Sequence, residues 1–330
     1  MAAPCSLASL RSSALVTWQV EPPGVRLRRV MLGLATCHNL PDWEVDDQSL
    51  FDALDELGIA FERPVWSDST VDWSRYRAVL IRTTWDYQER QPEFVAWLRA
   101  VSEVTELINP SRVVEWNTHK TYLRDLEKAG AEITPTLWVD RGESINLSEA
   151  LEAHGWERGF IKPMVGATAR ETLRFSRDEE GIAAAEAHLQ RLLPNEGLMI
   201  QPYLASVETE GEYSCIDFGS RLSHGVQKIP VPGDYRVQDD FGATDKPHEF
   251  SPADQATIEE VRSALGRVLE ERFPGDSLAY ARMDFLRGPQ GRLWLNELEL
   301  VEPSLFLRHS PAAGMTLARV LVQRLGLSSS

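Results

Sequence analysis

The sequence predicts an α/β segment followed by α+β segments, and two patterns of apolar residues indicate this. In the first third, short apolar runs alternate with stretches of helical periodicity, which is typical of parallel βαβ units. In the second half, several strand-like stretches follow one another, which favours antiparallel pairing. With 330 residues, 43% of them hydrophobic, the chain can bury the cores of two or three lobes.

The first third predicts strands and helices in regular alternation. Residues 30–35 form an apolar run that indicates a buried strand, and residues 49–57 carry a helical stripe. The stretches 61–66 and 78–81 predict further strands, and 94–101 predicts a second helix. Because parallel strands need crossover connections, we expect a small parallel sheet flanked by helices.

The rest of the chain predicts two further lobes. Asn117 can cap a helix that continues to Ala129. The other elements of the middle third are strands at 136–139, 160–163 and 198–204 and a helix at 178–193. The second half predicts strands at 212–218, 221–229, 279–286 and 292–300 and helices at 252–273 and 315–325.

We expect four segments along the chain. They are a disordered extension at 1–28, a substrate-side N-terminal βαβ domain at 29–114, a central lobe at 115–205 and a C-terminal lobe at 206–330. The extension is set apart because the first thirty residues hold four arginines against one glutamate, whereas the chain as a whole is acidic.

The composition bears on partners and compartment. The formal net charge of −16 disfavours binding to nucleic acid or to anionic membranes, and no apolar run approaches the roughly 18 residues of a membrane span. Three widely separated cysteines offer no disulfide framework and no zinc-binding spacing. We therefore expect a cytoplasmic protein that acts on small molecules, as a monomer or a homodimer.

A predicted hairpin near the C-terminus concentrates carboxylates. Arg282 and Asp284 share one face of a strand, Glu297 and Glu299 share one face of the next, and residues 287–291 have turn composition. One pairing register brings the three carboxylates together, and a slip by one residue separates them. Together they could bind Mg²⁺ or Mn²⁺ through oxygen ligands alone; the alternative is a solvated acidic face.

Two lysines and a polar connector complete the pattern. Lys120 opens a predicted helix and Lys162 ends a predicted strand, so both could hold phosphates or could be surface charges. The run from Gln201 through Tyr203 and Leu204 could offer its backbone to an adenine edge, with Glu208 on ribose hydroxyls. The alternative is a plain connector between lobes.

In this order, the features resemble the ATP-grasp superfamily over residues 29–325. The resemblance implies an ATP-grasp fold, in which ATP lies between two α+β lobes. It implies phosphate contacts from Lys120 and Lys162, adenine and ribose contacts from Gln201, Tyr203, Leu204 and Glu208, and two Mg²⁺ ions on Asp284, Glu297 and Glu299. Arg236 and Arg282 become candidates for steadying the transferred phosphoryl group, with Glu212 and Lys228 as weaker candidates for polar roles.

The chain departs from that superfamily at two places. Glu299 stands where an asparagine is common, which makes the metal site more negative. The loop at residues 165–170, which would cover the phosphates, keeps one glycine where several are usual. The role of Arg170 in loop closure is therefore left open.

A narrower resemblance is carried by residues 35–37, 81–87 and 297–303. These stretches resemble the subgroup that contains the cyclo-ligase of D-cycloserine biosynthesis, which closes a ring on an ureido-serine. Arg82 and Asp86 would then face the cleft and hold a substrate's carboxylate and amine, or they would pair with each other.

The resemblance implies an ATP-dependent carboxylate–amine ligase acting on an amino-acid-like molecule. It would form an amide through an acyl phosphate and release ADP and phosphate. The alternatives are an intramolecular cyclo-ligase, a nucleotide-binding regulator without turnover, and an acidic scaffold that binds no nucleotide.

Overall fold

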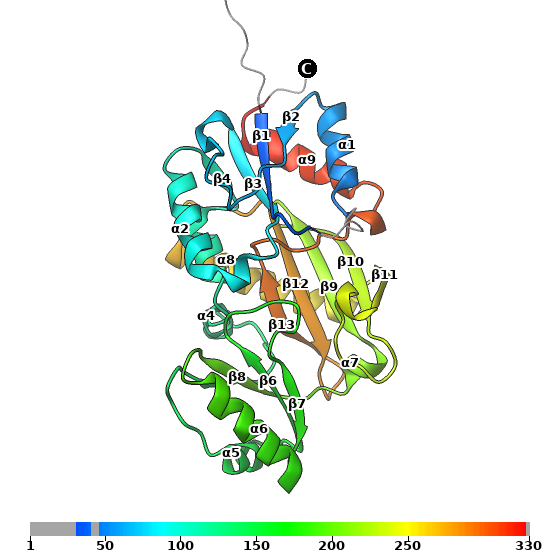
Figure 1. Ribbon diagram of the computed structural model, residues 1–330. Helices are drawn as coiled ribbons and strands as arrows, with labels where there is room; N and C mark the ends of the chain where they lie inside the picture. The colour runs from blue at the N-terminus through cyan, green and yellow to red at the C-terminus, as the bar shows by residue number, and fades with distance from the viewer. Residues whose placement is uncertain (1–30, 41–45, 328–330) are drawn as a thin grey trace, which may run out of the picture.

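The computed structural model describes residues 31–40 and 46–327. Within them, the strands form three sheets, which follow one another from top to bottom in Figure 1. The extension expected at residues 1–28 lies outside the described residues, so its disorder stays a prediction.

The N-terminal sheet is parallel and has the order β2-β1-β3-β4. Its strands are β1 (Met31–Thr36), β2 (Ala60–Glu62), β3 (Ala78–Thr83) and β4 (Glu106–Ile108), with helices α1 (Gln48–Glu56) and α2 (Gln91–Ser102) as connections. Nearly all of β1 and the whole of β3 are buried, which explains their continuous apolar runs. The expected parallel sheet is confirmed.

The central sheet is antiparallel and has the order β5-β8-β6-β7. Its strands are β5 (Leu137–Val139), β6 (Arg158–Pro163), β7 (Leu173–Ser176) and β8 (Leu198–Pro202). Helices α5 (Leu147–His154) and α6 (Glu179–Leu192) share an apolar core with this sheet. They lie at the bottom of the molecule in Figure 1, on the outer side of the sheet.

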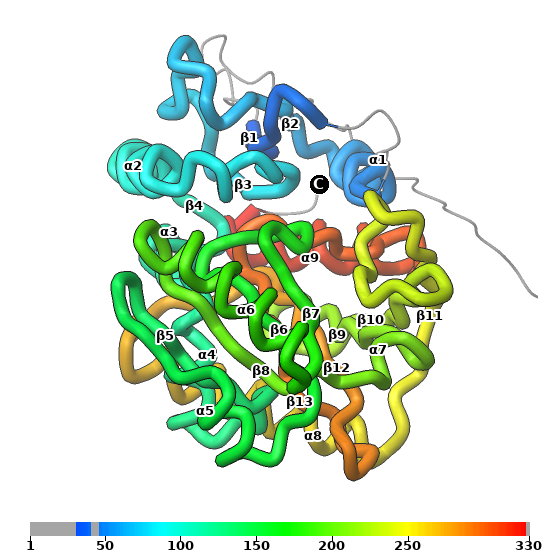
Figure 2. The backbone as a smooth tube through the Cα atoms, turned by 60° about the horizontal axis from the view of Figure 1, so that its bottom comes forward, coloured from blue at the N-terminus to red at the C-terminus, as the bar shows by residue number. Residues whose placement is uncertain are grey.

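The C-terminal sheet is antiparallel and has the order β11-β10-β9-β12-β13. Its strands are β9 (Glu212–Phe218), β10 (Arg221–Ile229), β11 (Thr244–His248), β12 (Tyr280–Arg287) and β13 (Leu293–Glu299). Helices α4 (Tyr122–Lys128) and α8 (Pro252–Arg272) share its apolar core. Figure 2 shows the central sheet lying across β12 and β13.

The remaining elements are short or join the lobes. They are α3 (Ser111–Asn117), α7 (Ser206–Thr209), α9 (Ala313–Arg324) and the 3₁₀ turns η1 (Trp73–Arg75), η2 (Tyr87–Glu89), η3 (Asp239–Phe241) and η4 (Leu307–His309). Helix α9 packs against α1 and shares a core with β1, so the end of the chain completes the N-terminal lobe. The division at residues 114 and 205 stays a proposal; the first boundary lies inside α3.

The start of one helix was predicted wrongly. Asn117 ends α3 and does not cap the next helix, because its side chain bonds to the backbone of β13 and the residue after it, with Nδ2 donating to Leu298 O and Oδ1 accepting from Leu300 N. Lys120 consequently lies in the turn before α4 rather than inside a helix. The short elements α3, α5, α7, β7 and β11 were not predicted from the sequence.

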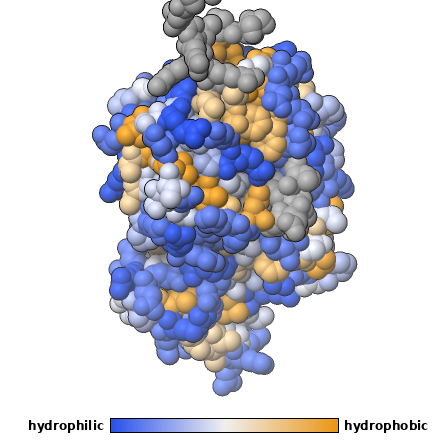
Figure 3. All heavy atoms as spheres, turned by 45° about the horizontal axis from the view of Figure 1, so that its top comes forward, coloured by the Kyte–Doolittle hydropathy of each residue, from blue (hydrophilic) through white to orange (hydrophobic). Residues whose placement is uncertain are grey.

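The face of the molecule drawn in Figure 3 is mainly polar. Figure 3 shows hydrophilic side chains over most of one face, with small apolar patches between them. Among the described residues, no helix is both long and apolar enough to cross a membrane.

Candidate active site

A cavity of about 510 Å³ lies where the three sheets meet. β12 and β13 form one wall, the connection between β6 and β7 covers it, and residues 85 and 86 of the N-terminal lobe close one end. Its charged lining residues are Asp86, Glu89, Lys120, Lys162, Arg170, Glu212, Lys228, Arg236, Asp239, Asp240, Arg282, Asp284, Glu297, Glu299 and Glu302. The cavity is therefore rich in both signs of charge.

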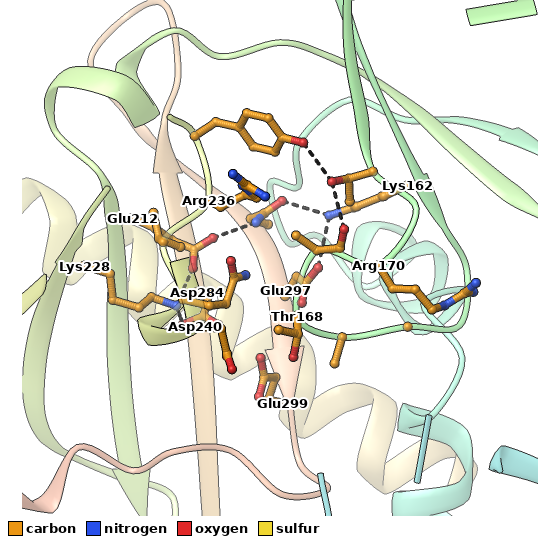
Figure 4. Close-up of a pocket in the computed structure, with 18 of the residues that line it drawn as sticks. Lys162, Thr168, Arg170, Glu212, Lys228, Arg236, Asp240, Asp284, Glu297 and Glu299 are labelled. Atoms are coloured by element: carbon orange, nitrogen blue, oxygen red, sulfur yellow. Dashed lines mark hydrogen bonds and ion pairs between the residues drawn. The ribbon is translucent and has the colours of Figure 1, made fainter. Parts of the chain in front are cut away.

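The hairpin of β12 and β13 has the register that gathers the carboxylates. Asp284 pairs with Glu297, and Arg282 pairs with Glu299. A register shift follows Asp284, so it leaves these two pairings unchanged. Figure 4 shows Asp284, Glu297 and Glu299 pointing into the same space, and we call these three residues the acidic trio.

Asp284 is held by two cations. Arg282 Nη2 lies 2.9 Å from its Oδ2, Lys228 Nζ lies 3.4 Å from Oδ1, and the Ser214 hydroxyl donates to Oδ1 at 2.5 Å. Burial alone would raise the pKa of Asp284, but these positive neighbours lower it to about 2. Asp284 is therefore ionised throughout the neutral range.

Glu297 is held by the two lysines that the sequence singled out. Lys120 Nζ lies 3.2 Å and Lys162 Nζ lies 3.3 Å from Glu297 Oε1. The Lys120 backbone N–H donates to Met164 O at 2.7 Å, which anchors the turn before α4 beside the end of β6. Burial would raise the pKa of Glu297, but the two lysines bring it below its usual value. We call Lys120 and Lys162 the lysine pair.

A chain of polar contacts continues from the lysine pair across the sheet. Lys162 Nζ donates to Asn296 Oδ1 at 3.0 Å, and Asn296 Nδ2 donates to Glu212 at 2.7 Å. Glu212 in turn forms a close ion pair with Lys228. Glu212 and Lys228, the weaker candidates from the sequence, thus belong to the same charged network (Figure 4).

Two further carboxyl groups have less positive charge beside them than Asp284 and Glu297 have. Burial raises the pKa of Glu299 to about 7 although Arg282 contacts it closely. Burial together with the charge of Glu299 raises the pKa of Glu302 to about 8. These two carboxyl groups therefore keep their protons up to about neutral pH when no cation is bound beside them.

The donor set of the acidic trio fits magnesium chemically. Its ligands would all be carboxylate oxygens, and Mg²⁺ commonly uses one or two carboxylates together with phosphate oxygens. No group of three His, Cys, Asp or Glu side chains within residues 31–40 and 46–327 is arranged to hold a metal by itself. The side chains are instead engaged by Arg282, Lys228 and the lysine pair, so phosphate oxygens would have to supply the remaining ligands.

The connector after β8 lies on another part of the cavity wall. Gln201, Tyr203 and Leu204 all line the cavity, as the adenine hypothesis requires. Gln201 is buried and donates from Nε2 to Thr136 Oγ1 at 2.9 Å. This hydrogen bond joins β8 to the residue that precedes β5.

Glu208 lies beside this wall but outside the cavity lining. Its carboxylate accepts from Tyr203 OH at 2.5 Å and from Arg174 Nη1 at 3.2 Å. The Tyr203 hydrogen bond, followed by the charge of Arg174, lowers the pKa of Glu208. A ribose contact would require this carboxylate to share or exchange those partners.

The two candidate arginines differ in how far their side chains are exposed. Arg282 is buried and fixed by Asp284 and Glu299 within the sheet. Arg236 lies on a loop, forks onto Asp234 with Nη2–Oδ2 at 2.6 Å, and stacks over Phe241 at 4.0 Å. Arg236 is thus the more exposed of the two cations at the cavity.

The structure does not bring Arg82 and Asp86 together. Arg82 is 2% exposed, does not line the cavity, and pairs with Asp47 at 2.7 Å between Nη2 and Oδ1. Asp86 does line the cavity and accepts from Trp66 Nε1 at 2.7 Å. Arg82 was expected to face the cleft. Its guanidinium is instead paired with Asp47 and does not line the cavity.

The loop between β6 and β7 reaches across the cavity. The Ala167 N–H donates closely to Gln88 of the N-terminal lobe, and Thr172 Oγ1 lies 3.0 Å from Tyr235 OH. Thr168 and Ala169 have φ of 49° and 52°, in the left-handed region that glycine favours. Arg170 turns toward Glu196 and away from the acidic trio.

Sequence reasoning missed Glu302 as a cavity residue. It lies three positions after the acidic hairpin, in a stretch quoted only for its likeness to a subgroup. The run of glutamates at 297, 299 and 302 was the available signal, but the bend at residues 301 and 302 could not be foreseen.

Comparison with known proteins places this geometry in a family. A family model described as the N-terminal domain of D-cycloserine synthetase DcsG matches residues 32–109. The cycloserine biosynthesis protein DcsG of Streptomyces lavendulae is 33% identical over 290 residues, which span 86% of this chain and 94% of that protein. The chain belongs to the D-cycloserine synthetase family of ATP-grasp ligases.

Solved structures agree with the family. The crystal structure of D-cycloserine synthetase DcsG superposes with a TM-score of 0.80 at 32% identity, covering 89% of this chain and 99% of that one. D-alanine–D-alanine ligase from Bacillus anthracis, complexed with ATP, superposes with a TM-score of 0.63 at 14% identity, covering 88% and 94%. The latter shows the fold alone. The predicted superfamily, fold and enzyme class, a ligase that forms carbon–nitrogen bonds, are confirmed.

Proposed function

We propose that this ligase joins a carboxylate to an amine by way of an acyl phosphate, with release of ADP and phosphate. The observation that carries the proposal is the meeting of the lysine pair and the acidic trio in one cavity. Phosphate groups need such cations, and metal-bound phosphates need such carboxylates. The substrate we propose is amino-acid-like, with ATP as the second substrate.

The chemistry needs charge neutralisation rather than a protein nucleophile. An oxygen of the substrate carboxylate attacks the γ-phosphorus, the bond to the bridging oxygen of ADP breaks, and an amine nitrogen then displaces phosphate from the acyl carbon. Both reactants of the first step are negative, so cations that align them lower the barrier. The lysine pair, Arg236 and Arg282 are the side chains we assign to that task.

The remaining contacts follow the cavity wall. We assign the adenine edge to the backbone of Tyr203 and Leu204 next to Gln201, and the ribose to Glu208. We assign two Mg²⁺ ions, or Mn²⁺ with the same oxygen donors, to the acidic trio. When bound, such ions shield the repulsion between the carboxylate and the phosphate. Asp86 is our candidate for contact with the substrate.

Ring closure within one molecule is the second candidate. It is favoured by the 33% identity to a protein named for cycloserine biosynthesis. The chemistry is the same, except that the carboxylate and the nitrogen belong to one substrate.

A product screen tests the proposal and separates the two forms. Amino acids, dipeptides and O-ureido-serine are incubated with Mg·ATP, phosphate release is followed, and products are weighed by mass spectrometry. A joining enzyme gives a product with the mass of two components less one water, and a ring-closing enzyme gives a single component less one water. Failure of every compound to stimulate ADP formation contradicts the proposal.

A further inference from the structure

The seven residues that follow β13, residues 300–306, are fixed through their backbone, and we call them the strap. Each of its carbonyl oxygens accepts a hydrogen bond from a side chain. The donors, in chain order of the acceptors, are Asn109, Tyr280, Trp85, Arg82, Arg282 and, for the last two carbonyls, His224. Backbone groups held in this way leave the strap little freedom to move.

The strap presents alternate side chains to the cavity. Glu302, Ser304 and Phe306 line it, whereas Val301 and Leu305 are buried in the apolar cores. The Trp85 Nε1–H donates to the carbonyl of Glu302 at 3.2 Å, and Arg82 Nη2 donates to the next carbonyl at 3.3 Å. Arg82, which does not reach the cavity, therefore acts by positioning the strap.

Glu302 is the unusual member of this wall. It is 8% exposed, and apart from its own backbone N–H no group among the described residues donates a hydrogen bond or an ion pair to its carboxylate. The cations that act on it from a distance are Arg282 and Lys120, and both are paired with other carboxylates. A buried carboxylate is seldom left in this state unless a ligand completes it.

The surroundings of Glu302 select the charge of that ligand. Glu299 lies toward the same end of the cavity, and Asp86 and Glu89 of the N-terminal lobe also line it. The carboxyl groups around Glu302 make this part of the cavity acidic, which repels phosphate and favours a cation. Among the groups that an amino-acid-like substrate carries, the cation is its ammonium.

We propose that Glu302, held in place by the strap, binds the ammonium group of an amino-acid substrate while the lysine pair holds phosphate. This inference rests on the proposed function and names the substrate class for its cavity. It also gives Arg82 and Trp85 a role as positioning residues.

Calorimetric titration of paired ligands tests the inference. Wild-type enzyme saturated with Mg·AMP-PNP is titrated with alanine, as each enantiomer, and with propionate, which has the same carboxylate but lacks the ammonium. We expect one enantiomer to bind at least about tenfold more tightly than propionate, and we expect Glu302→Gln to lose that preference. Wild type that does not prefer alanine overturns the inference, whether or not Glu302→Gln folds.

Two controls separate this result from other causes. Glu103→Gln removes the same charge from an exposed position at the end of α2 and should keep the wild-type preference. The affinity for Mg·AMP-PNP should stay within about twofold in Glu302→Gln. If that affinity falls while the alanine preference persists, Glu302 serves the metal and the inference is wrong. Failure of the wild type to bind Mg·AMP-PNP at all would instead contradict the proposed function.

Discussion

At the scale of single residues, the carboxylates of the cavity differ in how they are compensated. Asp284 is held by Arg282 and Lys228, and Glu297 by the lysine pair. Glu299 shares Arg282 with Asp284, and Glu302 has no cation of its own. Compensation by neighbouring cations is therefore strong at Asp284 and Glu297 and weak at Glu299 and Glu302.

Lys162 offers the first prediction at this scale. It is buried and reaches Glu297 and Asn296, so we propose that it meets a phosphate when ATP binds. Lys162→Met keeps the length of the side chain and removes its charge, and we expect ADP release to fall at least about 100-fold. Lys128→Met, at an exposed position of α4, should leave the rate unchanged. Equal steady-state rates for the two variants would contradict the assignment.

The raised pKa of Glu302 predicts how stability changes with pH. Burial and the charge of Glu299 raise that pKa from about 4.5 to about 8, so the folded protein keeps a proton that the unfolded chain has lost. The corresponding stability is present below pH 4.5 and is lost as the pH rises through 8. In EDTA, wild type should therefore lose Tm relative to Glu302→Gln between pH 5 and pH 8. If the Tm of wild type and the Tm of Glu302→Gln changed equally with pH, the carboxyl group would titrate normally and the prediction would be wrong.

At the scale of elements, the C-terminal sheet positions most of the charge. β9 lies between β10 and β12, so it brings Glu212 beside Lys228 and Ser214 beside Asp284. The turn that leads into β9 must pass close to β10. Gly211 makes this possible, because it has φ of 77° and a Cβ there would lie 1.8 Å from Lys228 O.

A glycine pair tests this close approach. Gly211→Ala should destabilise the protein by about 3 kcal/mol, since left-handed strain and a backbone clash add together. Gly291 also has a positive φ of 76° but has no atom within 4 Å of a built Cβ. Gly291→Ala should therefore cost only about 1 kcal/mol. Urea unfolding measures both, and similar costs would remove the argument for close packing at Gly211.

How far the sequence could predict the structure depended on the range of the contacts. The hairpin of β12 and β13 was predicted to within about a residue at each end, because alternation and turn composition are local. The lysine pair and the acidic trio could be named because their spacing resembles a superfamily. Asn117 was assigned wrongly because its partners lie about 180 residues away, on β13.

Long-range contacts also explain why the positions of Arg82 and Glu302 could not be predicted. Arg82 was expected to contact substrate, but its partner Asp47 lies 35 positions earlier in the chain and takes up the guanidinium. Glu302 is brought to the cavity by hydrogen bonds from Trp85 and other distant side chains. Long-range contacts of this kind leave no local pattern in the sequence.

At the scale of the whole molecule, the first and the last α-helix of the described residues are packed together. α9 lies against α1, and Gly314 is where their backbones meet: a Cβ there would lie 2.2 Å from Ser49 O. This contact joins the N-terminal lobe to the C-terminal sheet.

Two helical glycines test this coupling. Gly314→Ala should separate α9 from α1 and lower the free energy of unfolding by about 3 kcal/mol. Gly266, inside α8, has no atom within 4 Å of a built Cβ, so Gly266→Ala should raise stability by about 0.5–1 kcal/mol. Thermal unfolding measures both variants. The two expected shifts have opposite signs, so a shift of the same sign in both variants would contradict the account.

The central claim is that the acidic trio and the lysine pair together hold a metal-bound triphosphate. Titration calorimetry with AMP-PNP, in Mg²⁺ and in EDTA, tests it most directly on wild type and on the Asp284→Asn, Glu297→Gln double variant. We predict that wild type binds AMP-PNP tightly only with Mg²⁺ and that the folded double variant loses at least about 100-fold in affinity. Binding by the double variant that matches wild type and still depends on Mg²⁺ would contradict the claim.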